Sequence, residues 1–209
     1  YPLDVLGAES EGIIGYLIEQ EFHNAIPERS LFATLLTQCV VDPDDPAFQH
    51  PTKPIGPIYD EATARTLAAV HGWSIAPDGK HWRRVVASPK PRAILETPEI
   101  ALLASHDAVV VCTGGGGIPV VKDAAGALHG IEAVVDKDLA SALLAQSLNA
   151  DKLLLLTDVE AVYLDYGKPN ARAIRRVAPS ALQPASFAAG SMSPKIEAAA
   201  GFVRQTGKA

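Results

Sequence analysis

The chain has 209 residues, 48% of them hydrophobic and 20% charged, a balance that is typical of folded globular proteins and excludes general disorder. Its formal net charge of −6 excludes a general electrostatic attraction to nucleic acid or to an anionic membrane, so an anion must be bound by a local group of donors. Two cysteines, Cys39 and Cys112, are too few for a disulfide framework and favour a reducing, cytoplasmic setting. No apolar run reaches the roughly 18 residues of a membrane span, and we do not expect Tyr1 to begin a signal peptide.

The first 41 residues predict a helix followed by a buried strand. Apolar residues at helical spacing predict a helix over 10–25, with Ser10 as N-cap and Pro27 as stop. The residues on this apolar stripe are Ile13, Ile14, Leu17, Ile18 and Phe22. Residues 31–41 are apolar on both faces and predict one continuous strand.

The composition changes between residues 42 and 92. This stretch holds eight prolines and both tryptophans, and it has little continuous apolar sequence. It still predicts a short helix at 60–72, closed by Gly72, and a strand that begins at His81. Because a bare loop of this length is uncommon in a compact protein, we expect a small subdomain here.

Helices and strands alternate through the rest of the chain. The expected elements are a helix at 97–105, a strand at 108–112, a helix at 138–150, a strand at 152–158 and a helix at 193–207. The strand at 152–158 is fully apolar, as in the interior of parallel sheets. This alternation predicts a three-layer α/β fold.

Four consecutive glycines, Gly114, Gly115, Gly116 and Gly117, follow the predicted strand at 108–112. Glycine tolerates positive φ and lets the backbone approach a ligand closely, so this loop is a candidate anion-binding nest at the carboxyl end of a strand. The spacing matches neither the P-loop nor the dinucleotide fingerprint. A simple flexible turn is the alternative.

Two further segments place a lysine at the start of a helix. In Asp136-Lys137-Asp138, the cation could face a phosphate while Asp138 orients other lysines, or Asp138 could serve only as an N-cap. In Gly190–Lys195, Ser193 suits the N-cap and Pro194 the first helical position, which puts Lys195 in the first turn. A cation there is unfavourable for the helix dipole unless it faces an anion. An ordinary exposed lysine is the alternative.

Lys53 lies in a stiff segment, PTKPIGP, inside the proline-rich stretch. Tyr163 and Tyr166 follow the predicted strand at 152–158 and either stack on a base or pack in the core. The six histidines show no metal-ligand spacing. Lysines and a glycine nest, with no nucleophile or metal cluster, favour phosphoryl transfer, whose catalysis is mostly positioning and charge neutralisation.

Eight segments that occur in order along the chain resemble the carbamate kinases of the amino acid kinase family. They are PLDVLGAESEGIIGY, VDPDDPAF, PTKPIGP, RRVVASPKP, GGGGIPVV, GIEAVVDKDLASALLA, LLLTDVEAVYLDYGKP and FAAGSMSPKIEAA. Together they cover essentially the whole chain. PTKPIGP and the proline-rich stretch are specific to carbamate kinases, whereas the DKD and GSMSPK elements are shared with relatives that act on aspartate, glutamate or uridylate.

The resemblance implies reversible phosphoryl transfer between ATP and carbamate, giving ADP and carbamoyl phosphate, and running toward ATP in fermentative arginine or purine-derived catabolism. It implies a three-layer α/β/α sandwich with a mostly parallel central sheet and a small protruding subdomain. The implied parts are a carbamate-binding lobe at 1–41 and 93–130, a lid at 42–92 and a nucleotide-binding lobe at 131–209. Mg²⁺ is expected with the nucleotide, and the expected assembly is a homodimer without nucleic acid or membrane partners.

The matching motifs also imply roles for single residues. Gly114 to Gly117 would cradle the carbamate or carbamoyl group, and Lys53 would reach over the site from the lid. Lys137 and Lys195 would stabilise the transferred phosphoryl group, and Asp138 would orient the lysines. The residues implied to surround the nucleotide are Lys137, Thr157, Asp158, Tyr166, Met192 and Lys195. No metal ligand from the protein is implied.

The chain also departs from the family pattern. Carbamate kinases begin with a strand ending in a Gly-Gly-Asn loop and then a His-Gly-Asn-Gly-Pro segment, and they end on a further strand and helix, none of which this sequence contains. We therefore expect these 209 residues to be part of a longer enzyme and to be inactive alone. The alternatives are another amino acid kinase phosphotransferase, with an amino acid or nucleotide acceptor, and a non-catalytic nucleotide-binding module.

Overall fold

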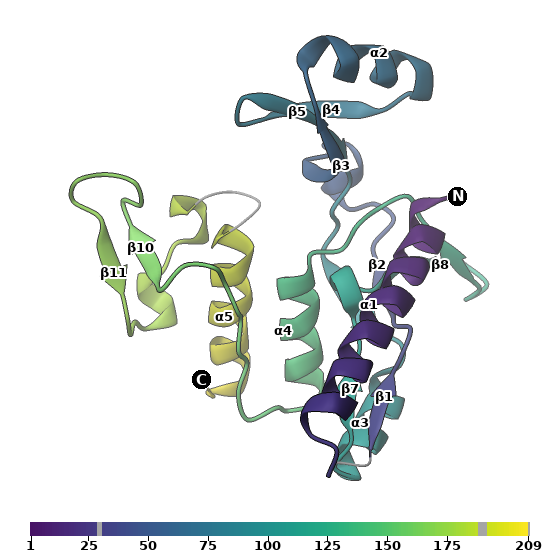
Figure 1. Cartoon of the computed structure of the whole chain (residues 1–209), viewed down its shortest axis with the longest axis vertical. Coiled ribbons are helices and arrows are strands. Elements are labelled where there is room, and N and C mark those ends of the chain that lie inside the picture. The colour runs from purple at the N-terminus through teal and green to yellow at the C-terminus, as the bar shows by residue number, and fades with distance from the viewer. Residues whose placement is uncertain (29–30, 188–191, 209) are drawn as a thin grey trace. The chain divides into compact units, whose positions relative to one another are not determined.

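The computed structural model describes residues 1–28, 31–187 and 192–208 (Figure 1). The chain divides into two compact units, Tyr1–Ala140 and Ser141–Ala209, and each is described by itself. The predicted functional parts, a carbamate-binding lobe, a lid and a nucleotide-binding lobe, have other boundaries than these two units. That division stays a prediction. Among the helices in the described ranges, none has both the length and the apolar character that crossing a membrane requires.

The first helix, α1 (Leu3–Ala25), is longer than predicted. Its N-cap is Pro2, so the prediction of a start at Ser10 is wrong, and the Ser10 hydroxyl instead donates to the Gly7 carbonyl within the helix at 2.9 Å. Ile26 follows as the C-cap, so the helix does end before Pro27.

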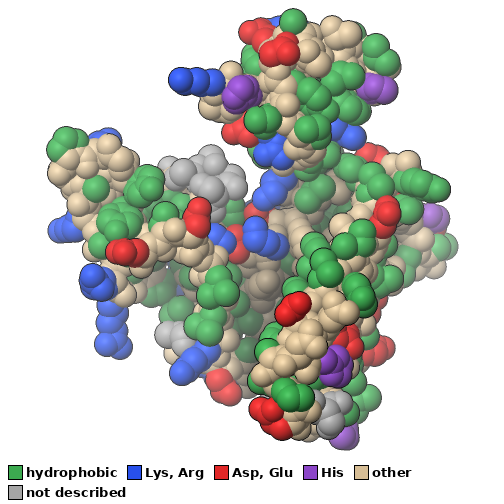
Figure 2. Space-filling model, viewed as in Figure 1, with side chains coloured by type: hydrophobic (Ala, Val, Ile, Leu, Met, Phe, Trp, Pro, Cys, Tyr) green, Lys and Arg blue, Asp and Glu red, His purple; other side chains and the backbone are tan. Residues whose placement is uncertain are grey.

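The face of α1 that packs inward is not the apolar stripe. Its buried residues are Glu11 and Gly15, and a Cβ added at Gly15 would collide with the side chain of Thr34. The small residue therefore lets α1 approach the neighbouring strand closely. The predicted stripe, including Ile13 and Leu17, is largely exposed instead, and Figure 2 shows hydrophobic side chains along α1.

The predicted strand at 31–41 is two strands, β1 (Phe32–Thr34) and β2 (Gln38–Val41). The prediction of one strand is wrong because the two halves pair with different partners. β1 runs parallel to β7 (Val109–Val111), whereas β2 belongs to a separate four-stranded sheet. The residues between them turn the chain from one sheet to the other.

The four-stranded sheet has the order β6-β2-β8-β9. β2 pairs in parallel with β8 (Ile118–Lys122) and antiparallel with β6 (Pro91–Ile94), and β9 (Leu128–Gly130) pairs antiparallel with β8. Helix α1 contacts β1 and β8, and α3 (Thr97–Ser105) contacts β7. Parallel pairs between strands flanked by helices confirm the α/β fold class.

The proline-rich stretch contains a compact subdomain. β3 (Lys53–Tyr59), β5 (His81–Val86) and β4 (Ser74–Asp78) form an antiparallel sheet in the order β3-β5-β4. Helix α2 (Glu61–His71) lies beside this sheet, as Figure 1 shows, and contacts β4 and β5. Asp60 caps it through the Thr63 N–H, and Gly72 ends it with a φ of 67°, so the helix and the strand predicted here are confirmed.

A small core lies between β2 and the start of α4 (Lys137–Ser147). Its buried members are Cys39, Val41, Val135 and Ala140, which come from β2 and from the junction into α4. Burial of these apolar side chains fixes the beginning of α4 against the strand. This junction carries the lysine and the two aspartates of the DKD segment.

The second unit contains α5 (Met192–Thr206) and a hairpin of β10 (Val162–Leu164) and β11 (Arg172–Ile174). The strand predicted at 152–158 is not formed, so that prediction is wrong for the described structure. None of the strands in the described ranges pairs with this segment, and a strand without a neighbour leaves its backbone groups unbonded. Leu154 and Leu156 are accordingly 79% and 89% exposed.

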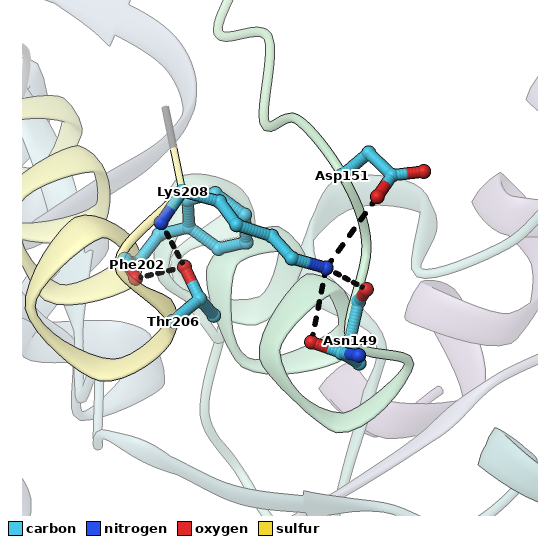
Figure 3. A network of polar contacts seen from close by, with 5 residues as sticks. All are labelled: Asn149, Asp151, Phe202, Thr206 and Lys208. Atoms are coloured by element: carbon cyan, nitrogen blue, oxygen red, sulfur yellow. Dashed lines mark hydrogen bonds and ion pairs between the residues drawn. The ribbon is translucent and has the colours of Figure 1, made fainter.

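The end of α5 is tied to the end of α4 (Figure 3). The Lys208 ammonium donates to the carbonyl oxygen of Asn149 at 2.8 Å and to its side-chain oxygen at 3.1 Å, and it lies 3.4 Å from Asp151. The Lys208 N–H donates to the Thr206 hydroxyl, which itself donates to the Phe202 carbonyl. One lysine at the end of α5 thus satisfies carbonyl and carboxylate oxygens just beyond the end of α4.

Candidate functional site

The glycine run forms a tight loop after β7. Residues Gly114–Gly116 form a 3-10 turn, and φ is positive at Gly115, Gly116 and Gly117, with values of 65°, 121° and 89°. Thr113, at the start of the loop, also has a positive φ of 52°, which is rare for a β-branched residue. The predicted positive φ angles are confirmed, and strain of this kind is common at binding sites.

Close packing explains why two of the loop positions are glycine. A Cβ at Gly116 would collide with the carbonyl oxygen of Val135, and a Cβ at Gly117 would lie 3.0 Å from the Cβ of Cys39. At Gly115 nothing lies within 4 Å, so this part of the loop faces open space. The loop therefore lies directly against the residue that precedes the DKD segment.

Asp136 begins helix α4, and its side chain is the cap. Its Oδ1 accepts hydrogen bonds from the N–H groups of Asp138 at 3.0 Å and of Leu139 at 3.3 Å. The interpretation of Asp138 as the N-cap is therefore wrong, because the chain enters the helix two residues earlier than that interpretation requires. Asp138 instead lies in the first turn, with its side chain buried.

The second oxygen of Asp136 binds the lysine of the proline-rich stretch. The Lys53 ammonium donates to Asp136 Oδ2 at 2.8 Å, across 83 residues of sequence. Burial alone would raise the pKa of Asp136, but the hydrogen bond and charge of Lys53, with the N–H groups of Leu139 and Asp138, hold that pKa below its ordinary value. Asp136 is thus an ionised, buried carboxylate at ordinary pH.

The structure gathers part of the predicted site in the first unit. Gly114 to Gly117, Lys53 and Asp138 lie around the Val135–Asp136 junction, through the contacts just described. Lys137 is at the same junction, with its side chain exposed. This group combines two cations, a glycine loop and a helix N-terminus, which suits an oxyanion such as a phosphate.

The remaining predicted residues belong to the second unit. Thr157 and Asp158 are exposed and lie 3.4 Å apart, hydroxyl to carboxylate, and Tyr166 is exposed with its ring tilted against that of Tyr163. The centroids of these two rings are 5.7 Å apart, so the tyrosines contact each other.

Helix α5 begins at Met192, so the prediction of Ser193 as N-cap is wrong. Because the helix begins before Ser193, Ser193 and Pro194 lie within the first turn, and Lys195 is also in that turn as predicted. Gly190 of the same motif lies outside the described residues.

Sequence reasoning missed Asp136, which belongs to this site, and Glu11, which lies behind the glycine loop. The signal for Asp136 is its place ahead of a helix, where an aspartate is a recognisable cap. Glu11 gave no signal, because a glutamate in an amphipathic helix normally faces solvent. In the structure Glu11 is buried and Oε2 accepts from the Thr37 N–H at 2.9 Å, which places a carboxyl group beside the glycine loop.

The residues around this site do not form a metal centre of their own. Within the described ranges, no three His, Cys, Asp or Glu side chains are grouped so that they could hold a metal ion.

Comparison with known proteins gives the family. The sequence profile of the amino acid kinase family matches residues 46–209. Carbamate kinase of Haemophilus influenzae is 53% identical over 208 residues, covering 100% of this chain and 67% of that protein. Carbamate kinase of Pyrococcus horikoshii is 46% identical, covering 99% of this chain and 68% of that protein.

Solved structures agree with these sequence matches. Carbamate kinase from Giardia lamblia bound to AMP-PNP superposes with a TM-score of 0.86 at 41% identity, covering 100% of this chain and 68% of that one. The same enzyme bound to citric acid gives a TM-score of 0.91. This chain thus spans about two thirds of the length of the relatives it matches. The chain belongs to the amino acid kinase family, and the relatives just described are carbamate kinases.

Proposed function

We propose that this chain carries the carbamate-binding and part of the nucleotide-binding machinery of a carbamate kinase. The reaction is reversible phosphoryl transfer between ATP and carbamate. In the ATP-forming direction, a β-phosphate oxygen of ADP forms a bond to the phosphorus of carbamoyl phosphate while the bond from phosphorus to the carbamate oxygen breaks. Identities of 44–53% to carbamate kinases along the whole chain support this reaction.

The observation that carries the proposal is the ion pair between Lys53 and Asp136. It brings the lysine of the proline-rich segment to the start of α4, beside the glycine loop. A carboxylate holds Lys53 at the position where a phosphoryl group would need a cation. Charge neutralisation of this kind is the main protein contribution to phosphoryl transfer.

The proposed roles rest on the matching motifs, and for Lys53 and the glycine loop also on this placement. Gly114 to Gly117 bind the carbamate or carbamoyl group, with Gly115 on the open side of the loop. Lys53 covers the site from the lid, Lys137 and Lys195 stabilise the transferred phosphoryl group, and Asp138 orients the lysines. Asp136 adds a role that the sequence did not indicate, since it holds Lys53 ready and caps α4.

The proposed nucleotide site lies in the second unit. Thr157, Asp158, Tyr166 and Met192 would surround ATP or ADP, and an amino acid kinase relative is solved with AMP-PNP bound. Mg²⁺ would arrive with the nucleotide, bound through its phosphate oxygens, and would neutralise charge on them.

We also propose a homodimer in a cytoplasmic setting. The exposed apolar stripe of α1, which includes Ile13, Ile14 and Leu17, is a surface that a second subunit would cover. The two-cysteine composition favours a reducing compartment.

Substitution of Lys53 tests the proposal. In the complete protein that contains these residues, Lys53→Met should lower the rate of ATP formation from carbamoyl phosphate and ADP on the order of 10²-fold. Lys80→Met is the matched control, because Lys80 is an exposed lysine in the β4–β5 turn of the same lid. Thermal unfolding measurements should show that both variants are folded. Equal rates of ATP formation for the two folded variants would contradict the role of Lys53.

A further inference from the structure

A buried carboxyl group lies at the centre of α1, outside the machinery just proposed. Glu11 is only 4% exposed. Its Oε2 accepts a hydrogen bond from the Thr37 N–H at 2.9 Å, while its Oε1 is buried without a hydrogen-bond partner among the described residues. A buried polar atom without a partner is costly, so the position requires an explanation beyond helix packing.

The partner of Glu11 holds both ends of the glycine loop. Thr37 is completely buried, and its hydroxyl accepts from the Thr113 N–H at 2.8 Å where the loop begins. Its carbonyl oxygen accepts from the Ile118 N–H at 2.7 Å where the loop ends. The Thr37 hydroxyl donates its own hydrogen to the Leu35 carbonyl at 2.9 Å, which leaves a lone pair for Thr113.

Glu11 also contacts the loop directly. A Cβ added at Gly114 would lie 3.0 Å from the Cγ and 3.4 Å from the Cα of Glu11. The first glycine of the loop therefore packs against the glutamate side chain, and the third packs against the Val135 carbonyl. These two packing contacts and the two Thr37 hydrogen bonds together leave the loop little freedom to change its conformation.

We propose that Glu11 is a positioning residue for the glycine loop, acting through Thr37 and through its contact with Gly114. This inference rests on the proposed function for its catalytic consequence, because the loop is where the carbamoyl group would bind. Glu11 does not touch the substrate in this account. It fixes Thr37, and Thr37 fixes the loop amides at residues 113 and 118.

The neutral carboxyl group is sufficient for this role. Burial raises the pKa of Glu11 to about 7, the hydrogen bond from Thr37 opposes that shift, and the charge of Glu96 adds to it. The other titratable groups that interact with Glu11 are the thiols of Cys39 and Cys112. Glutamine keeps the acceptor oxygen without a charge, so Glu11→Gln should preserve the function that Glu11→Ala removes.

The same helix offers a matched control. Glu19 lies two turns farther along α1, and its Oε2 accepts a hydrogen bond from the Thr34 hydroxyl at 2.7 Å. It therefore also joins α1 to a threonine, but this threonine lies in β1 and not at the loop. Glu19→Ala removes a comparable helix-to-strand hydrogen bond and leaves the loop contacts intact.

The kinetic test uses the complete protein with varied carbamoyl phosphate and ADP. Glu11→Ala and Thr37→Val should lower kcat/KM for carbamoyl phosphate by about tenfold or more, since small displacements of a binding group have large effects on rate. KM for ADP should stay unchanged, and Glu11→Gln and Glu19→Ala should resemble the wild type. Equal losses in Glu11→Ala and Glu19→Ala, or in Glu11→Gln and Glu11→Ala, would overturn the proposal.

A second measurement does not depend on the reaction. Hydrogen exchange of the peptide that spans residues 113–118 should be faster in Glu11→Ala and Thr37→Val than in the wild type and Glu19→Ala. Unchanged exchange in this peptide would overturn the positioning role. If the wild type forms no ATP, the proposed function fails, whereas the exchange comparison still decides whether Glu11 holds the loop. Thr37→Val, which keeps the side-chain volume, covers the case in which Glu11→Ala does not fold.

Discussion

The Lys53 ammonium and the Asp136 carboxylate lie 2.8 Å apart, although 83 residues separate them in the sequence. The pair joins β3 of the proline-rich subdomain to the first turn of α4. One Asp136 oxygen binds the lysine and the other caps the helix, so the position of Lys53 and the start of α4 depend on the same side chain. An incoming phosphoryl group would compete with Asp136 for Lys53.

Substitutions of Asp136 separate its two functions. Asparagine is as good an N-cap as aspartate, so Asp136→Asn should keep the cap and lose the ion pair, whereas Asp136→Ala should lose both. We expect Asp136→Ala to be less stable than Asp136→Asn by about 1 kcal/mol in urea unfolding.

Asp60 is the control for the cap of Asp136. It caps α2 through the Thr63 N–H, and its described hydrogen bonds do not include a lysine. The Asn and Ala variants of Asp60 should therefore differ by a similar amount, while KM for carbamoyl phosphate should change only with Asp136. Equal stabilities of Asp136→Asn and Asp136→Ala would contradict the cap.

Alanine substitutions should rank three glycines by their surroundings. Gly12 lies in α1 with open space around it, so Gly12→Ala should be neutral or stabilise by up to about 1 kcal/mol. Gly115→Ala should cost roughly 1–2 kcal/mol from its positive φ alone. Gly116→Ala adds a collision with the Val135 carbonyl and should be the most damaging to stability and to activity. Chemical denaturation of the three variants checks this order, and a Gly116→Ala variant as stable as Gly115→Ala would contradict the packing.

The raised pKa of Glu11 predicts a pH dependence of stability. The folded state holds a proton on Glu11 up to about pH 7, whereas the unfolded chain releases it near the ordinary value of 4.5. The folded state therefore binds more protons between these two pH values, and the stabilisation present below pH 4.5 is lost as the pH rises through 7. The free energy of unfolding of the wild type should fall relative to that of Glu11→Gln across this window. A constant difference between the two proteins from pH 4 to pH 8 would contradict the prediction.

Both cysteines should be unreactive in the folded protein. Burial, with a further contribution from the charge of Glu11, raises the pKa of Cys39 to about 12 and that of Cys112 to about 11. The thiolate is the reactive form, so labelling by iodoacetamide at pH 8 should be slow for the folded protein and fast after denaturation. Rapid labelling of Cys39, whose side chain is fully buried, would contradict its placement in the core.

Elements that begin and end at capping or glycine residues could be predicted from the local sequence. The ends of α2 follow from Asp60 and Gly72, and the positive φ angles of the glycine loop follow from four residues without side chains. The break in the strand at 31–41 could not be predicted in this way, because it depends on pairing with β7 and β8, more than 70 residues away. The exposed segment at 152–158 has the composition of a strand but no neighbouring strand among the described residues.

The candidate site could likewise be predicted only where a sequence motif marks it. Gly114 to Gly117, Lys53, Lys137 and Asp138 were predicted from motifs, and the structure brings them to one junction. The Lys53–Asp136 pair and the burial of Glu11 arise from tertiary packing, which residue type and spacing do not encode. A glutamate on α1 is expected in solvent, and only the approach of Thr37 and Gly114 encloses it.

The acceptor specificity of the complete protein tests the central claim most directly. The protein that contains these residues should form ATP from carbamoyl phosphate and ADP with Mg²⁺, and in the reverse direction should phosphorylate carbamate but not glutamate or uridylate. That result would establish the carbamate kinase reaction for this member of the amino acid kinase family. Phosphorylation of glutamate or uridylate without any ATP formation from carbamoyl phosphate would contradict it.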